Sequence, residues 1–357
     1  MRQEELTALL EERDLDAALV SCPANIRYLS GFVGTESYLY LSKERGVILT
    51  DSRYTLQAKE EAKGFEVQTI GGGRGYGSLL AELILRDRVR ALGFEENSML
   101  YGTVRKLQKE AGLAPACWKP LGDTLSLLRA VKRPEEIEKM ERAERIGDEA
   151  FSYILNELKP GVTELQIAAK LEYFMRSQGA EGTSFDTIVA SGLHSAMPHA
   201  VPTEKLLEKG DFVTMDFGCK YQGYCSDMTR TVVIGKADEK QKELYRIVLE
   251  AQEAALCGLR PGITGSEGDR LARDVIEKAG YGEYFGHGLG HSVGLEIHER
   301  PALSARDKTV LLPGMIETVE PGIYIPGFGG VRIEDMVTLT QSGIRNLTSS
   351  PKELIEL

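Results

Sequence analysis

Apolar and polar positions in the first third of the chain follow periods that predict alternating helices and strands. Residues 1–10 have an amphipathic helical pattern, and short apolar runs at 16–20, 38–41 and 46–50 predict strands. Further helical and strand segments continue as far as Gly93. We therefore expect a small α/β domain over residues 1–124.

A second domain is predicted to begin after this point. A basic stretch at 129–134 ends in Pro134, which suits the first turn of a helix, and a pattern of regularly spaced apolar residues follows it. The chain of 357 residues is also longer than a single hydrophobic core usually supports. We expect the second domain to span residues 125–357.

The second domain contains an internal repeat. Segments 158–163 and 259–264 both read Leu, a basic residue, Pro, Gly, an aliphatic residue and Thr. Three residues after each threonine comes Gln166 or Glu267, the spacing of a capping box that satisfies the free amides of a new helix. The same helix-turn-helix is therefore predicted twice.

The repeat extends into acidic positions. Gly210 precedes Asp216 at the same spacing with which Gly314 precedes Glu320, and each half then supplies a second acid. The four acids are Asp216, Asp227, Glu320 and Glu334. A duplicated unit folded about a pseudo-twofold axis would bring these two acidic pairs face to face at its centre.

Asp216 and Asp227 lie on two β-patterned runs that are close in sequence. A hairpin that turns about Tyr221 and Gln222 would place Asp216 directly opposite Asp227. Their Cβ atoms would then be about 4.5–5.5 Å apart, which is unfavourable for two free carboxylates and favourable around a cation. A lone acid is usually a surface charge, but four acids in matched positions favour a metal site.

Glu320 and Glu334 also lie in β-patterned runs, 318–324 and 331–340, and strand alternation along these runs places two neighbours of this acidic pair. Arg332 is predicted on the same face as Glu334, where it could orient a ligating carboxylate. Glu317 is predicted on the face opposite Glu320. We therefore do not expect Glu317 to be a ligand.

All five histidines lie in two short windows of the second domain. His194 and His199 form the first window, and His287, His291 and His298 lie in a second window that is rich in glycine. Their spacing is not HExxH, which excludes a zincin. One imidazole with four carboxylates makes an oxygen-rich site that suits Mn, Fe or Co better than a structural zinc.

Composition excludes several classes of function. A net charge of −11 without a dense run of Lys and Arg argues against nucleic acid as a partner. No apolar run is long enough to cross a membrane, and the N-terminus lacks the pattern of a secretory signal. Five scattered cysteines without CxxC spacing fit a reducing compartment. We expect a cytoplasmic protein.

These motifs resemble those of the pita-bread metallopeptidases, family M24, in the branch of Xaa-Pro aminopeptidases and Xaa-Pro dipeptidases (prolidases). The segments that carry the resemblance are 25–32, 215–231, 286–299, 318–324 and 330–335. The resemblance implies an α/β (α+β) fold, with a creatinase-like N-terminal domain before a pseudo-twofold duplicated catalytic domain. It also implies a homodimer.

The resemblance assigns a role to each candidate ligand. It implies that Asp216 binds one metal ion, that His291 and Glu320 bind another, and that Asp227 and Glu334 bridge both. The implied cofactor is a pair of divalent ions, with manganese favoured and cobalt, iron or zinc as alternatives.

The implied catalytic residues are His199, His298 and Glu320. By resemblance, the two histidines contact the substrate carbonyl and the tetrahedral intermediate. Two cations about 3.5–4 Å apart would acidify a bridging water, whose hydroxide attacks the amide carbonyl. Glu320 is the candidate for proton transfer to the leaving prolyl nitrogen.

Several nearby residues receive other interpretations. His194 and His287 are expected to have structural or ligand-orienting roles. The aromatic residues Tyr224, Phe285 and Tyr324 could line a proline pocket or simply pack beside it. Ala302 stands where many dipeptidases resembling this chain have an arginine for the substrate carboxylate, which favours substrates longer than two residues.

We therefore expect an exopeptidase that hydrolyses the Xaa-Pro bond at the N-terminus of short, proline-containing peptides. A methionine aminopeptidase or a creatinase-like hydrolase is an alternative, but the former usually lacks the N-terminal domain and the latter lacks the full ligand set. A non-enzymatic peptide-binding protein on the same fold is a further alternative. Relatives of that kind have lost ligands, whereas all five are present here.

Overall fold

The computed structural model describes residue 8 and residues 10–357. The chain divides into two compact units, one ending at Leu128 and the other spanning Arg129–Leu357. Helix α6 (Thr124–Ala130) contains this boundary and the one expected after residue 124. The helix predicted over residues 1–10 lies almost entirely outside the described residues. Among the residues that are described, no helix combines the length and apolar character needed to cross a membrane.

The first unit is built on one mixed sheet with strand order β4-β3-β2-β1-β5-β6. Its strands are β1 (Ala17–Val20), β2 (Ser37–Ser42), β3 (Gly46–Thr50), β4 (Glu66–Thr69), β5 (Leu92–Phe94) and β6 (Trp118–Pro120). Its helices are α2 (Pro23–Ser30), α3 (Thr55–Glu61), α4 (Tyr76–Arg86), α5 (Tyr101–Ala111) and a 3₁₀ turn (Pro115–Cys117). The three strands predicted from apolar runs are confirmed as β1, β2 and β3.

Two pairs of helices in the second unit reproduce the predicted repeat. They are α7 (Pro134–Ile154) with α8 (Glu164–Ser177), and α9 (Glu239–Gly258) with α10 (Gly265–Lys278). Both capping boxes are confirmed, because Thr163 caps α8 with Gln166 and Thr264 caps α10 with Glu267. An isolated β-bridge follows at the same place in each half, at Thr163 and at Thr264.

The strands of the second unit fall into the same two halves. The first half contains β7 (Gly182–Thr183), β8 (Ile188–Ser191), β9 (Phe212–Phe217), β10 (Cys219–Tyr221), β11 (Tyr224–Cys225) and β12 (Met228–Val233). The second contains β13 (Gly290–Ser292), β14 (Glu299–Leu303), β15 (Ile316–Val319), β16 (Gly322–Ile325), β17 (Gly329–Arg332), β18 (Asp335–Leu339) and β19 (Ile344–Asn346). Two 3₁₀ turns complete the unit, Gly192–Ala196 and Gly282–Tyr284.

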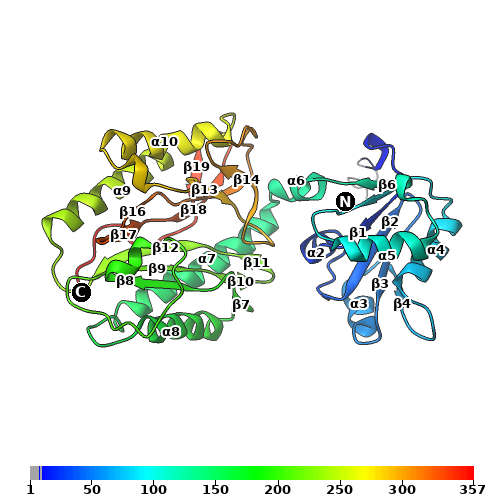
Figure 1. The fold of residues 1–357 in the computed structure, drawn as a ribbon, viewed down its shortest axis with the longest axis horizontal. Helices are drawn as coiled ribbons and strands as arrows, with labels where there is room; N and C mark the ends of the chain where they lie inside the picture. Colours follow the sequence, from blue (N-terminus) through cyan, green and yellow to red (C-terminus); the bar gives the residue numbers. More distant parts are fainter. Residues whose placement is uncertain (1–7, 9) are drawn as a thin grey trace. The chain divides into compact units, whose positions relative to one another are not determined.

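The hydrophobic cores lie between these strands and the helices. One cluster of buried residues packs α7 and α8 against β9 and β12, and another packs α9 and α10 against β15 to β18. Figure 1 shows α9 and α10 on one side of the strands and α8 on the other. The strands that carry the candidate ligands are therefore held between two helical layers.

The predicted β9 hairpin exists, but its predicted register is wrong. Asp216 pairs with Thr229 rather than with Asp227. The turn lies at Gln222 and Gly223, whose φ angles of +48° and +83° fit a two-residue hairpin turn. The register differs from the prediction by two residues, so Asp227 stays on the same face as Thr229.

The long strands predicted around three of the acids are also wrong in one respect, because each is interrupted. Asp227 lies between β11 and β12, Glu320 between β15 and β16, and Glu334 between β17 and β18. These three acids therefore lie at the ends of short strands rather than within long ones.

Candidate metal centre

The second unit contains a cavity of about 570 Å³ that all seven predicted site residues line. They are His199, Asp216, Asp227, His291, His298, Glu320 and Glu334. These residues span more than a third of the chain and come from both halves of the repeat. The structure therefore brings together the whole predicted set.

Three carboxylates form the closest group in this cavity. Asp216, Asp227 and Glu334 each offer an oxygen, and the three oxygens lie within 4.8 Å of one another. Burial, followed by the charges of Glu334 and Asp216, raises the pKa of Asp227 well above its ordinary value. Burial, followed by the charges of Glu320 and Asp216, does the same to the pKa of Glu334. Such crowding is unfavourable unless a proton or a cation compensates it.

The donor atoms of this group fit a divalent cation. Asp216 Oδ1 is buried and has no hydrogen-bond partner within the described protein. A buried oxygen without a partner costs free energy, and a cation would satisfy it. Carboxylate oxygens of this kind are the ligands that hard divalent ions prefer.

His291 and Glu320 extend the group on one side. His291 Nε2 lies 3.5 Å from Glu320 Oε1 and 3.6 Å from Asp227 Oδ2. Burial, followed by the neighbouring His298, lowers the pKa of His291 to about 4, so its imidazole is neutral at pH 7. Its Nδ1 lies 3.2 Å from the Ser292 carbonyl oxygen, and donation there leaves Nε2 unprotonated and able to bind a metal.

Glu320 is a third acid of the cavity whose surroundings favour a bound proton. Burial, with a smaller contribution from the charge of Asp216, raises the pKa of Glu320 to about 8. Thr318 Oγ1 donates to Glu320 Oε1 over 3.1 Å, which fixes the carboxyl group. Without a cation, this carboxyl group is mostly protonated at neutral pH.

Arg332 orients two of the acids, as predicted from strand alternation. Its Nη2 donates to Asp216 Oδ2 over 2.7 Å, and its Nη1 donates to the Tyr324 hydroxyl over 2.8 Å. Its Nε donates to Thr229 Oγ1 over 3.0 Å, and this hydroxyl donates to Glu334 Oε2 over 2.7 Å. One guanidinium therefore fixes Asp216 directly and Glu334 through a threonine.

The remaining histidines divide between the cavity and its surroundings. The ring of His298 packs edge-on against His291, with centroids 4.5 Å apart. His287 lines the cavity, but its Nε2 lies 3.0 Å from the Tyr324 hydroxyl and its Nδ1 lies 2.8 Å from the Gly288 carbonyl oxygen. His194 Nδ1 lies 2.9 Å from the buried carboxylate of Glu164. Both contacts agree with the structural roles expected for His194 and His287.

The apolar residues that line the cavity are not the aromatic residues that the sequence suggested for a proline pocket. None of Tyr224, Phe285 and Tyr324 is among the described residues that line the cavity. The apolar lining instead comprises Phe185, Ile188, Pro198, Ala200, Val201, Pro202 and Ile297. Four of these residues lie within three positions of His199 in the sequence, so proximity to that histidine was the available signal.

Glu317 lies outside the cavity, as predicted. It is fully buried in β15, opposite Ser292 of β13, and neither carboxylate oxygen has a hydrogen-bond partner in the described protein. Burial raises the pKa of Glu317 well above its ordinary value. The nearby Lys132 instead contacts Ser292 Oγ at 3.0 Å and Glu299 at 3.3 Å.

Comparison with known protein families decides the assignment. Residues 138–341 match the model of metallopeptidase family M24, and residues 2–131 match the creatinase/prolidase N-terminal domain. The chain belongs to metallopeptidase family M24. The expected fold, a creatinase-like N-terminal domain followed by a pita-bread domain, is confirmed, and so is the expected class of metal-dependent peptidase.

Individual proteins are similar to this M24 metallopeptidase along nearly its whole length. An Xaa-Pro dipeptidase of Pyrococcus horikoshii is 41% identical, over 99% of this chain and 98% of its own. The structure of an Xaa-Pro dipeptidase from Bacillus anthracis is 45% identical with a TM-score of 0.96, covering 100% of this chain and 99% of its own. That of an X-Pro aminopeptidase from Thermotoga maritima is 40% identical with a TM-score of 0.92, covering 99% of each chain.

Proposed function

We propose that this M24 metallopeptidase removes the first residue from short peptides whose second residue is proline. The observation that carries the proposal is the buried group of four acids and one neutral histidine facing a cavity with an apolar wall. The similarity to proteins named Xaa-Pro dipeptidase and X-Pro aminopeptidase supports the choice of substrate.

We propose that the five ligands hold two divalent ions. Asp216 would hold one ion, His291 and Glu320 the other, and Asp227 and Glu334 would contact both. An oxygen-rich donor set with one imidazole favours manganese, with cobalt, iron or zinc as alternatives. Bound ions of this kind supply a nucleophile at neutral pH and polarise the scissile carbonyl.

Other residues of the cavity would position the peptide and move protons. His199 and His298 would donate to the carbonyl oxygen as negative charge develops on it. Glu320 would accept the proton of the nucleophile and pass it to the prolyl nitrogen. Phe185, Ile188 and other apolar lining residues would pack against the pyrrolidine ring.

We propose that peptides longer than two residues are accepted. Of the described residues that line the cavity, Arg332 is the sole Lys or Arg, and it is engaged with Asp216 and Tyr324. The cavity therefore offers no uncommitted guanidinium or ammonium group for the carboxylate of a dipeptide. Ala302, where many dipeptidases resembling this chain have an arginine, agrees with this preference.

We also propose a cytoplasmic homodimer. All five cysteines lie within the described residues and are free, which suits a reducing compartment. The dimer rests on resemblance to the family alone. Light scattering of the purified protein would test it.

The decisive experiment compares three peptides on metal-free protein before and after reconstitution with Mn²⁺. The peptides are Xaa-Pro, Xaa-Pro-Yaa and the matched Xaa-Ala-Yaa, with Asp227→Asn as the inactive control. We expect cleavage only after reconstitution, only before proline, and faster for the tripeptide. If neither proline peptide were cleaved, the proposal would be refuted. Faster cleavage of the dipeptide than of the tripeptide would refute the length preference alone.

A further inference from the structure

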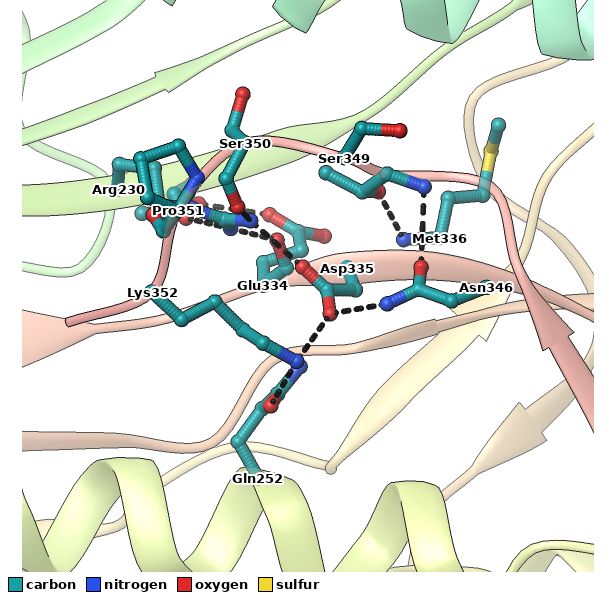
Figure 2. Close-up of polar contacts among 12 residues, drawn as sticks. Arg230, Gln252, Glu334, Asp335, Met336, Asn346, Ser349, Ser350, Pro351 and Lys352 are labelled. Atoms are coloured by element: carbon teal, nitrogen blue, oxygen red, sulfur yellow. Dashed lines mark hydrogen bonds and ion pairs between the residues drawn. The ribbon is translucent and has the colours of Figure 1, made fainter.

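A short segment near the C-terminus, residues 346–352, is tied to the structure directly behind two of the candidate ligands. The contacts begin at Asp335, the residue after Glu334. Asp335 is fully buried, and its two oxygens accept from Arg230 Nη2 over 2.8 Å, Lys352 Nζ over 2.9 Å and Asn346 Nδ2 over 2.6 Å (Figure 2). Two of these three partners come from the C-terminal segment.

Arg230 joins the same segment to the backbone of Glu334. Its guanidinium is buried, and Nη1 donates to the Glu334 carbonyl oxygen over 2.5 Å. Nη2 and Nε donate to the carbonyl oxygens of Ser350 over 2.7 Å and Pro351 over 3.0 Å. Figure 2 shows the segment passing beside Arg230 as these contacts require.

A second set of contacts joins the segment to Asp227 through helix α7. Glu144 Oε1 accepts from Thr348 Oγ1 over 2.5 Å, while Glu144 Oε2 lies 3.3 Å from the Asp227 amide nitrogen. One turn further along α7, Asp148 accepts from the amides of Ser349 and Ser350. The segment therefore contacts structures that fix the backbone of Asp227 as well as that of Glu334.

The chemistry of this network suits positioning better than stability. A buried ion pair rarely adds net stability over apolar residues of similar size, because removing each charge from water is costly. Hydrogen-bonded partners behind a metal ligand, in contrast, commonly change metal affinity about 10- to 100-fold. Asp227 and Glu334 are also the two acids for which we propose contact with both ions.

We propose that residues 346–352 act as a clamp that holds Asp227 and Glu334 at the separation that metal binding requires. Lys352 and Thr348 are its positioning residues, and Arg230 transmits the contact to Glu334. The clamp rests on the proposed metal-binding function. It predicts that loosening the segment weakens metal binding without touching any ligand.

The test compares two changes in the same C-terminal tail. Lys352→Met removes the contact with Asp335 and keeps the aliphatic stem. Glu356→Gln weakens the ion pair in which Lys236 Nζ lies 2.7 Å from Glu356 Oε2. Within the described residues, neither member of this pair contacts a candidate ligand. Each variant is titrated with Mn²⁺ by calorimetry, and the visible absorption spectrum of its Co²⁺ form is recorded.

We expect Lys352→Met to weaken Mn²⁺ binding about 10- to 100-fold and to shift the Co²⁺ bands. Lys352→Arg should restore both in part, and Glu356→Gln should leave both unchanged. Wild-type affinity and spectrum in Lys352→Met, even with a lower melting temperature, would overturn the clamp. If wild-type protein bound no Mn²⁺, the proposed function itself would fail.

A second variant covers the case in which Lys352→Met does not fold. Thr348→Val removes the hydroxyl, which donates to Glu144 and accepts from the Met336 amide over 2.9 Å, and the two side chains have similar volumes. The clamp predicts weaker Mn²⁺ binding for this variant as well. Unchanged binding in a folded Thr348→Val protein would contradict the contribution through Asp227.

Discussion

Glu334 and Asp335 are neighbours in sequence and equally buried, with exposures of 1% and 0%, yet their surroundings have opposite effects. Burial and the charges of other acids raise the pKa of Glu334 well above its ordinary value. Burial alone would also raise the pKa of Asp335, but Arg230 and Lys352 together lower it below its ordinary value. The fold therefore places two cationic side chains beside the carboxylate of Asp335, whereas other acids surround the carboxylate of Glu334.

This difference separates two uses of a buried carboxylate. Around Asp335 the chain supplies two cations and an amide, so the site is complete without a ligand. Around the Glu334 carboxylate the charges of Asp216, Asp227 and Glu320 gather, and the nearby guanidinium of Arg332 donates directly to Asp216 and reaches Glu334 through Thr229. The second group is complete only with cations from outside the chain.

The largest expected effect comes from a substitution at Asp335, whose carboxylate is fully paired within the chain. Asp335→Asn leaves the buried Arg230 and the partly exposed Lys352 without their carboxylate, and an unpaired buried charge such as that of Arg230 costs about 3–5 kcal/mol. We expect the free energy of unfolding in urea to fall by roughly that amount. A loss below about 1 kcal/mol would show that water reaches the two cations and would weaken the contrast.

The matching substitution, at Glu334, should weaken metal binding rather than lower the free energy of unfolding. Glu334→Gln keeps an oxygen for Thr229 and removes one negative charge from a crowded group. We expect Mn²⁺ affinity and peptidase activity to fall by at least about 100-fold, the upper end of the range for indirect partners. The metal-free protein should be at least as stable as wild type, and a clear loss of stability there would contradict the repulsion.

The sequence was sufficient to predict the composition of this site, because its signals are local or repeated. Capping boxes at Thr163 and Thr264 depend on residues three apart, and both formed as predicted. Strand alternation correctly oriented Arg332 and Glu317. The matched acids in the two halves lie around one cavity because the repeat itself folds as two similar halves.

The sequence did not predict the features that depend on backbone conformation or on contacts between distant segments. The hairpin register depended on which residues adopt positive φ, and Gln222 with Gly223 formed the turn instead of Tyr221 with Gln222. The breaks at Asp227 and Glu334 interrupt runs with continuous β pattern. The contacts of Asp335 with the tail join residues that no periodicity relates.

The pH dependence of stability offers a weaker test of the same contrast. In the folded protein burial raises the pKa of Glu320 and of Glu144 to about 8, whereas an unfolded Glu titrates near about 4.3. Between these values the folded state binds more protons, so the free energy of unfolding falls as pH rises. The lowered pKa values of His287 and His291 act in the opposite direction, but only between about 4 and 6.5.

Above pH 6.5, of these groups, only the two glutamates still bind more protons in the folded state. They therefore determine the sign of the change in the free energy of unfolding with pH. We expect the metal-free protein to lose stability between pH 6.5 and 8, on the order of 1 kcal/mol per pH unit. Mn²⁺ should reduce this loss, because a cation replaces the protons. Asp335 adds no slope here, since its stabilisation is already present above its unfolded pKa and is lost only in acid. Urea denaturation at the two pH values, with and without Mn²⁺, measures the difference.

An effect of similar small size is expected at Glu317, a buried acid with neither a cation in contact with its oxygens nor a role in the cavity. Within the described part of the chain both of its oxygens lack hydrogen-bond partners, and Lys132 already contacts Glu299. Glu317→Met removes these unsatisfied atoms at similar volume, so we expect a gain of about 1–2 kcal/mol with unchanged activity and Mn²⁺ affinity. Glu317→Gln, which keeps a polar group there, should gain less. A loss of stability in Glu317→Met would mean that Lys132 depends on this carboxyl group, and Glu317 would then resemble Asp335 rather than an acid left without a cation.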